Sequence, residues 1–149
     1  MRNIDLFNKD NTVFSFEVFP PKTTSGLQSI TSVIGDLLKL NPKYMSVTYG
    51  AGGSMQDNRT LELCKMIKDL SDIEPLAHMT CVGSTKNDID QLVAELKKIN
   101  VKNILTLRGD GGENGLTKGD FTYASSLASY INSKYGNDFC LGGACYPVG

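Results

Sequence analysis

Metal-binding side chains are scarce in this sequence. It contains a single histidine, His78, and its four cysteines include no Cys-x-x-Cys pair. Because a zinc cage needs several closely spaced cysteine and histidine ligands, this composition gives a metal site little support. Two of the cysteines, Cys64 and Cys140, fall where core residues are expected, so we expect buried free thiols and a reducing, cytoplasmic environment.

Neither an excess of charge nor a long apolar run is present. Fifteen basic and sixteen acidic residues leave a net charge of -1, which gives no support for binding nucleic acid or an anionic membrane surface. No run approaches the roughly 20 apolar residues that span a bilayer. The first residues, Met1 to Asp5, lead into a polar segment without a secretory hydrophobic region.

Strand and helix patterns alternate along the whole chain, which we interpret as one domain, residues 1–149. Apolar positions at helical spacing separate five β-like runs, as is typical of parallel β-α-β units. Thr24 or Ser25 is expected to cap the first helix, and Thr85 or Asn87 the third. The predicted strands are Val13–Val18, Tyr44–Thr48, Pro75–Thr80, Asn103–Leu107 and Phe139–Ala144.

Alternation along each strand divides the side chains between two faces of the sheet. One set is apolar and suits packing against helices, whereas the other gathers polar groups toward the carboxyl ends of the strands. A doubly wound sheet should be apolar on both faces, but a (β/α) barrel turns one face into its lumen, so the pattern favours an α/β barrel. The polar set is Ser15, Glu17, Ser46, Thr48, His78, Thr80, Thr106, Arg108, Asp110, Ala144 and Tyr146. The apolar set is Phe14, Phe16, Val18, Met45, Val47, Ala77, Met79, Leu105 and Leu107.

The number of strands is smaller than a complete barrel needs. A (β/α)8 TIM barrel has eight strands and typically about 250 residues, whereas this sequence supplies about the first five strands and four helices. A five-stranded arc leaves an open edge and an uncovered polar face. We therefore expect the N-terminal part of a larger barrel, or an arc that closes by pairing with another copy.

Glu17 is the one charged residue in the apolar run of residues 13–19, which Pro20 and Pro21 end. A charge in a buried strand is costly unless it is paired or hydrogen-bonded. A carboxyl group that keeps its proton near neutral pH because of burial is a ready general acid. The alternative is an edge strand whose Glu17 side chain faces water. The strand alone leaves both interpretations open.

Two glycine-rich stretches, residues 50–54 and 109–115, follow the second and fourth strands. Neither has the Gly-x-Gly-x-x-Gly spacing of dinucleotide sites, because Met55 and Asn114 take the sixth positions. Neither contains the Gly-Lys-Ser/Thr of a phosphate-binding loop. They suit loops whose backbone approaches a ligand closely, and ordinary turns explain them equally well.

Several polar side chains are expected to meet where the strands end. Glu17, Thr48, His78 and Asp110 share the polar set, and Arg108 adds a cation after the fourth strand. This combination suits binding of a polar, aromatic, partly anionic cofactor. The alternatives are a core histidine with its hydrogen bonds made and a structural ion pair between Arg108 and Asp110.

Six segments of the sequence form a longer pattern. They are Phe16–Lys22, Val47–Ser54, His78–Cys81, Leu105–Asp110, Phe121–Ala124 and Gly143–Pro147. Together they resemble the methylenetetrahydrofolate reductase family, in that family's order, from about residue 13 to the last residue. One such motif is weak support, but six in order are specific.

The resemblance implies a flavin-containing barrel of one-carbon metabolism that uses NAD(P)H, through FAD, to reduce 5,10-methylenetetrahydrofolate to 5-methyltetrahydrofolate. Glu17 matches the family's general acid, which promotes opening of the folate imidazolidine ring. Asp110 matches a carboxylate beside the flavin pyrimidine edge that also helps hold the pterin, and Thr48 matches a position near the flavin's reactive nitrogen. The other implied flavin-contacting positions are His78, Arg108, Gly109, Ala124 and Tyr146.

The sequence leaves three alternative hypotheses about function open. The first is a flavoenzyme with ping-pong hydride transfer from NAD(P)H to methylenetetrahydrofolate. The second is a non-catalytic half-barrel that binds flavin weakly, or a subunit completed by a partner chain or a second copy, because the family's later strands do not occur in this sequence. A third, a barrel enzyme acting on phosphorylated substrates, suits the rim arginine and the glycine loops.

Overall fold

The chain folds into alternating strands and helices. The structure, a computed structural model, describes residues 1–7, 12–21, 23–49, 59–110 and 119–145. The strands are β1 (Ser15–Val18), β2 (Tyr44–Val47), β3 (Glu74–Thr80), β4 (Asn103–Leu107) and β5 (Cys140–Gly143). The helices are α1 (Thr24–Leu38), α2 (Arg59–Leu70), α3 (Lys86–Lys98) and α4 (Ala124–Tyr135), with short 3-10 helices η1 (Asn3–Leu6) and η2 (Gly136–Asp138).

All neighbouring strands pair in parallel, in the order β1-β2-β3-β4-β5. Parallel neighbours require a crossover connection, and the helices between the strands supply it. The predicted α/β class with consecutive β-α-β units is therefore confirmed. Within the described residues, β1 and β5 form the two edges of the sheet.

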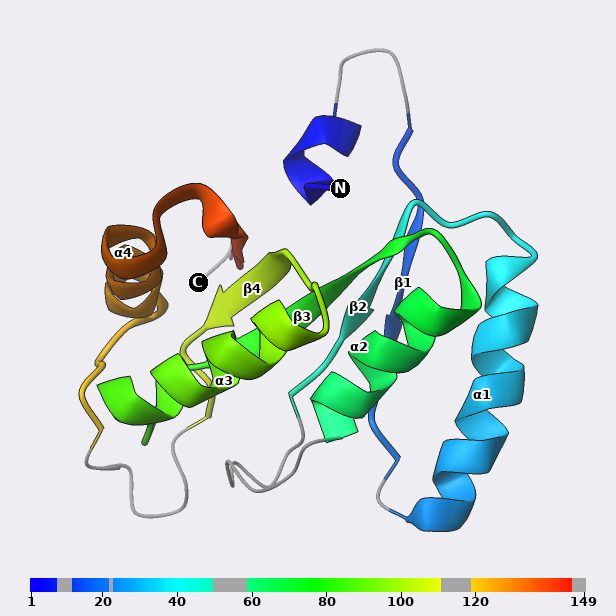
Figure 1. Cartoon of the computed structure of the whole chain (residues 1–149), viewed down its shortest axis with the longest axis horizontal. Coiled ribbons are helices and arrows are strands. Elements are labelled where there is room, and N and C mark those ends of the chain that lie inside the picture. The colour runs from blue at the N-terminus through cyan, green and yellow to red at the C-terminus, as the bar shows by residue number, and fades with distance from the viewer. Residues whose placement is uncertain (8–11, 22, 50–58, 111–118, 146–149) are drawn as a thin grey trace.

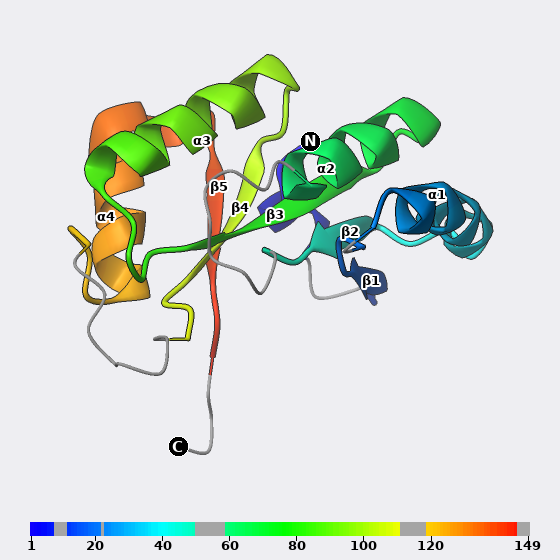
Figure 2. The same cartoon turned by 90° about the horizontal axis from the view of Figure 1, so that it is seen from below.

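The four helices form a layer on one side of the sheet. Figure 1 shows α2 and α3 in front of the strands and α1 beside them at the β1 end of the sheet, and Figure 2 shows the helices following one another around the outside of the sheet from α1 to α4. The core lies between the two layers and includes Ile34 of α1, Met45 of β2, Leu63 of α2, Ile104 of β4 and Leu127 of α4. Helices on one side are typical of a barrel wall and not of a doubly wound sheet.

The register between β3 and β4 places residues of β4 on the opposite faces from those predicted. Leu105 pairs with His78, and Leu107 pairs with Thr80. Side chains of directly paired residues point to the same side of a sheet. These two leucines therefore lie on the face of the polar set, and their assignment to the apolar, helix-facing set is wrong.

Thr106 accordingly lies in the helix-covered layer, paired with Met79. Its side chain is buried there, and its hydroxyl donates a hydrogen bond of 2.9 Å to the carbonyl oxygen of Gly142. A polar side chain can occupy a core position when its hydrogen bond is made. The prediction that Thr106 shares the face of Glu17 and His78 is therefore wrong.

The helix starts agree with the sequence at one of the two predicted caps. Thr85 caps α3 and exchanges hydrogen bonds with Asp88, which forms a capping box. At α1 the cap is Thr23, whose backbone is extended and whose hydroxyl oxygen accepts a backbone N–H of the first turn. Thr24 and Ser25, the predicted caps, are already helical.

All four cysteines are free thiols. Cys64 is buried on α2, and burial raises the pKa of its thiol to about 12, which makes it inert. Cys140 is only partly buried, so its predicted full burial is wrong. It lies on the edge strand β5, and the register places it on the same face as Ser46, which the helices do not cover. Among the described helices, none is long and apolar enough to cross a membrane.

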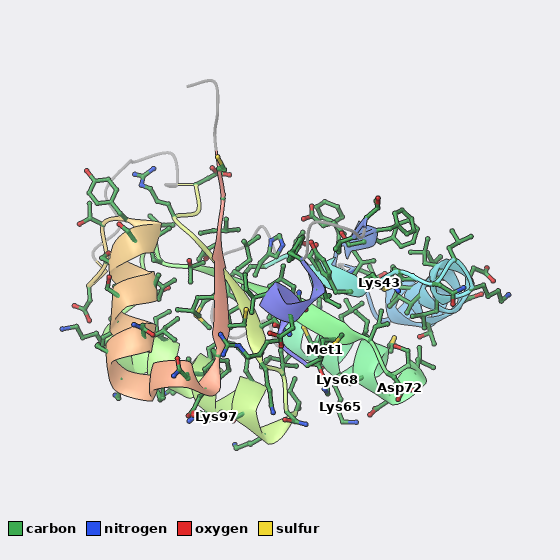
Figure 3. The ribbon with its side chains drawn as sticks, turned by 90° about the horizontal axis from the view of Figure 1, so that it is seen from above. Met1, Lys43, Lys65, Lys68, Asp72 and Lys97 are labelled. Carbon is green, nitrogen blue, oxygen red and sulfur yellow. The ribbon has the colours of Figure 1, made fainter. Side chains whose placement is uncertain are left out.

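The first residues pack where the strands begin. The Met1 amino group lies 2.9 Å from Oε1 of Glu74 at the start of β3, and Nζ of Lys68 lies 3.2 Å from the same oxygen. Asn103, at the start of β4, accepts the N–H of Asn3 and donates to the carbonyl of Met1. Figure 3 shows Met1 and Lys68 close together at this end. These contacts tie the N-terminal segment to the end of the sheet opposite the predicted site.

Candidate active site

The carboxyl ends of the strands carry the predicted site residues that the structure describes. Parallel strands end at the same edge of a sheet, which places these residues on one rim. Tyr146 lies outside the described residues, as do residues 50–54 and 111–115 of the glycine-rich stretches. The described members are Glu17 on β1, Thr48 directly after β2, His78 on β3, residues 108–110 after β4 and Ala124 at the start of α4.

Glu17 and His78 meet across β2. Oε2 of Glu17 lies 3.4 Å from Nε2 of His78. Ser46, the residue of β2 that pairs with Glu17, donates a hydrogen bond of 3.3 Å from its Oγ to the same oxygen. Three strands thus bring a carboxylate, a hydroxyl and an imidazole together, and the predicted shared face of these residues is confirmed.

His78 is buried and favours the neutral form. Its side chain is 8% exposed, and burial lowers its pKa below the ordinary 6.5, while the Glu17 carboxylate acts in the opposite direction. Its Nε2 has no hydrogen-bond partner among the described residues, because the contact with Glu17 lacks hydrogen-bond geometry. An unpaired buried nitrogen is costly. The interpretation of His78 as a core histidine with its hydrogen bonds made is therefore wrong.

Glu17 is only half covered by protein. β1 is an edge of the described sheet, and 49% of the Glu17 side chain is exposed. Within the described residues, Glu17 therefore matches the interpretation of a side chain that faces water on an edge strand, and not that of a fully buried carboxyl. The carboxylate is nevertheless not simply surrounded by solvent, because Ser46 and His78 contact its Oε2.

Thr48 is anchored through its backbone on both sides. Its N–H donates to the carbonyl of Val18 on β1 at 3.0 Å, and its own carbonyl accepts the Oγ1 hydroxyl of Thr60 at 3.0 Å. Thr60 lies in the first turn of α2 and is 4% exposed. A hydrogen bond between Thr48 and Thr60 therefore joins the residue that follows β2 to the first turn of α2.

The ends of β3 and β4 approach each other closely at Gly109. The N–H of Val82 donates to the carbonyl of Arg108 at 2.9 Å, so the pairing continues beyond the strands. Gly109 has a φ of +83°, and a Cβ at this position would lie 3.0 Å from Cβ of Thr80 and from Cγ1 of Val82. A left-handed backbone and this close approach together require glycine. The packing of the turn against β3 thus explains this glycine.

Arg108 and Asp110 have exposed side chains after the end of β4. The predicted strand alternation does not extend to them, because β4 ends at Leu107 and Gly109 turns the backbone. Within the described part of the chain they form no ion pair with each other. The alternative of a structural Arg108–Asp110 ion pair is therefore wrong.

Two residues of this rim were not predicted as site residues. Ser46 belongs to the predicted polar face, but no motif singles it out. The strand register could have identified Ser46. A residue that pairs with a functional residue of the neighbouring strand is that residue's nearest neighbour on the same face. Thr60 opens a helix after a glycine-rich stretch, where a hydroxyl commonly bonds to nearby backbone groups.

The arrangement suits proton transfer beside a bound aromatic group. A half-exposed carboxyl group with one oxygen held in place can exchange a proton with a ligand. The unpaired Nε2 of His78 fits a polar group of the flavin that the resemblance implies. Among the described residues, no group of three or more histidine, cysteine, aspartate or glutamate side chains could hold a metal ion.

The chain as a whole is similar to known proteins. The family model described as methylenetetrahydrofolate reductase matches residues 2–149. The chain is 38% identical over 157 residues to methylenetetrahydrofolate reductase 2 of Schizosaccharomyces pombe, which covers 100% of this chain and 24% of that protein. It is 36% identical over 140 residues to a probable methylenetetrahydrofolate reductase (NADH) of Oryza sativa subsp. japonica. That match covers 91% of this chain and 23% of the rice protein.

A bacterial relative is shorter. The chain is 36% identical over 133 residues to the 5,10-methylenetetrahydrofolate reductase of Escherichia coli, which covers 89% of this chain and 43% of that protein. The chain therefore spans between 23% and 43% of the length of these three relatives.

Proposed function

The chain belongs to the methylenetetrahydrofolate reductase family, and we propose that its protein reduces 5,10-methylenetetrahydrofolate to 5-methyltetrahydrofolate. The proposed electron donor is NAD(P)H. The chemistry that FAD supplies when bound is storage of the hydride between the two halves of a ping-pong cycle. The proposed location is the cytoplasm, where the four thiols stay reduced.

The observation that carries this proposal is the placement of the Glu17 carboxyl. It is half exposed at the rim, and Ser46 and His78 contact one of its oxygens. In the proposed reaction Glu17 gives a proton to a nitrogen of the imidazolidine ring, which opens to the iminium that accepts the hydride. The exposure of Glu17 gives a substrate access to the proton, and the two contacts limit where the carboxyl group points.

The same rim supplies the residues proposed to hold the flavin. His78 offers its unpaired Nε2, and Thr48 is held at both ends of its backbone. Asp110 is assigned to the pyrimidine edge of the flavin and to the pterin of the substrate. The remaining proposed contacts are Arg108, Gly109, Ala124 and Tyr146.

Replacing Glu17 with glutamine tests the proposed role of its carboxyl group. Glu17→Gln should leave flavin binding and NAD(P)H oxidation nearly unchanged, while folate reduction falls by about 10²- to 10⁴-fold. The two half-reactions are followed separately through the flavin absorption band near roughly 450 nm. The matched control is Asp36→Asn. Asp36 lies on helix α1, and its exposed carboxyl group is paired with Lys39. Equal loss of both half-reactions in Glu17→Gln would overturn the assignment.

A second candidate function is a non-catalytic arc completed by a partner chain or a second copy. In the described sheet β1 and β5 are open edges, and Phe14 and Phe19 on either side of β1 are 44% and 66% exposed. Open strand edges beside exposed apolar side chains favour pairing with another chain. A purified chain that binds FAD and oxidises NAD(P)H supports the flavoenzyme. A colourless chain that dimerises or aggregates supports the second candidate.

A further inference from the structure

Both contacts of the Glu17 carboxyl group with described residues fall on the same oxygen. Oγ of Ser46 lies 3.3 Å from Oε2, and Nε2 of His78 lies 3.4 Å from it. Only the Ser46 contact is a hydrogen bond, because Nε2 of His78 has no hydrogen-bond partner in the described part of the chain. Ser46 therefore makes the directional contact that distinguishes Oε2 from Oε1.

The two partners of this hydrogen bond differ in their freedom to move. Ser46 is buried on β2, a strand paired on both sides, and its side chain is short. Glu17 has a long side chain on an edge strand and is half exposed, so without a partner it would sample many rotamers in solvent. The rigid serine can therefore restrain the glutamate, and not the reverse.

We propose that Ser46 is a positioning residue for Glu17, whose hydroxyl holds Oε2 so that Oε1 carries the transferable proton toward the open rim. This assignment rests on the proposed role of Glu17 as general acid. A carboxylic acid bears its proton on one oxygen, and accepting a hydrogen bond at Oε2 favours protonation of Oε1. When the Oε1–H bond breaks and the proton passes to the substrate nitrogen, the negative charge left on the carboxylate strengthens the Ser46 hydrogen bond.

His78 provides a readout of the Glu17 position that needs no activity. It is the only histidine of the chain, so its imidazole NMR signal is identified without ambiguity. The Glu17 carboxylate from β1 raises the pKa of His78 against the effect of burial, and β4 presents the uncharged Leu105 at the paired position. A carboxylate that moves away from Nε2 therefore lowers the pKa of His78 further.

A double-mutant cycle in the 149-residue chain tests the proposal. Ser46→Ala should lower the pKa of His78, as Glu17→Gln should. When Glu17 is already glutamine, Ser46→Ala should cause no further change in the pKa of His78. Ser46→Thr keeps a hydroxyl and should restore the original pKa. Thr106→Val removes a buried hydroxyl from the helix-covered layer and should leave the pKa of His78 unchanged.

The half-reactions give a second readout. Ser46→Ala should slow folate reduction about tenfold and leave NAD(P)H oxidation unchanged, and Ser46→Thr should recover the rate. The proposal is overturned if Ser46→Ala leaves the pKa of His78 unchanged, or lowers it equally in the Glu17→Gln background. Failure of the proposed function has a different signature: Glu17→Gln then keeps full folate reduction while the pKa of His78 still follows the cycle.

Discussion

The hydroxyl of Thr60, in the first turn of α2, donates a hydrogen bond of 3.0 Å to the backbone carbonyl of Thr48, directly after β2. These two residues lie on either side of the glycine-rich stretch, so the bond closes the connection from strand to helix. Thr48 is a proposed flavin contact, and its position therefore depends on a residue with no proposed contact of its own.

Removing this hydroxyl should weaken both the fold and flavin binding. Thr60→Val keeps the shape of the side chain but leaves the Thr48 carbonyl without its partner. We expect the free energy of unfolding in urea to fall by about 1–3 kcal/mol, and the FAD affinity in a fluorescence titration to fall with it. Thr60→Ser keeps the hydroxyl and should preserve FAD affinity. An unchanged FAD affinity in Thr60→Val would show that Thr48 is positioned by other contacts.

Gly109→Ala should be strongly destabilising. An alanine there would combine a left-handed backbone, at about 1–2 kcal/mol, with a Cβ forced against Thr80 and Val82, at about 1–3 kcal/mol. The free energy of unfolding should therefore fall by about 2–5 kcal/mol. Gly143→Ala is the control, because a Cβ there meets no atom within 4 Å, and it should change stability by less than about 0.5 kcal/mol. Equal effects of both variants would contradict the close approach at Gly109.

Stability should fall as the pH is lowered through the titration of His78. Burial places the pKa of His78 in the folded chain below about 6.5, the ordinary value that applies when the chain is unfolded. The unfolded chain therefore binds the proton more readily, so stability is complete above pH of about 7 and is lost between about 6.5 and the folded pKa. In urea unfolding at a series of pH values, His78→Gln should lose less stability across this window. If the free energy of unfolding depends on pH identically in the original protein and in His78→Gln, His78 is not desolvated.

Glu74→Gln should destabilise the end of the sheet away from the site. The Glu74 side chain is 11% exposed and contacts both Lys68 and the Met1 amino group. Losing its charge leaves Lys68 without a carboxylate partner, so we expect the free energy of unfolding to fall by about 1–3 kcal/mol. Asp69→Asn breaks the exposed pair with Lys65 and should cost at most about 0.5 kcal/mol. Thermal unfolding of both variants, at low and high salt, measures the difference.

The faces of the first three strands could be predicted from sequence. In these strands the polar residues of one parity, such as Glu17, Ser46 and His78, do lie together on one side. In β4 the same reasoning failed, because Thr106 makes its hydrogen bond inside the core while Leu105 pairs with His78. Polarity indicates a face only when no partner for the polar group exists in the core.

Exposure was less predictable than pairing. The apolar run around Glu17 suits a central strand as well as an edge strand, and only the sheet order shows that β1 is an edge. Cys140 is partly buried at the opposite edge, where it lies on the face that the helices leave uncovered. The position of a strand within a sheet depends on which strands pair with it, and the residue pattern of the strand itself does not indicate those partners.

The sequence by itself determined the order of strands and helices, the alternation within each strand and the family resemblance, because each is a property of residues near one another in the chain. Only the tertiary structure decided how the alternation of one strand is aligned with that of the next. Hydrogen bonds between strands set that register, and they place Ser46 opposite Glu17 and Leu105 opposite His78. They also leave Nε2 of the single histidine buried beside a half-exposed carboxylate, without a hydrogen-bond partner among the described residues.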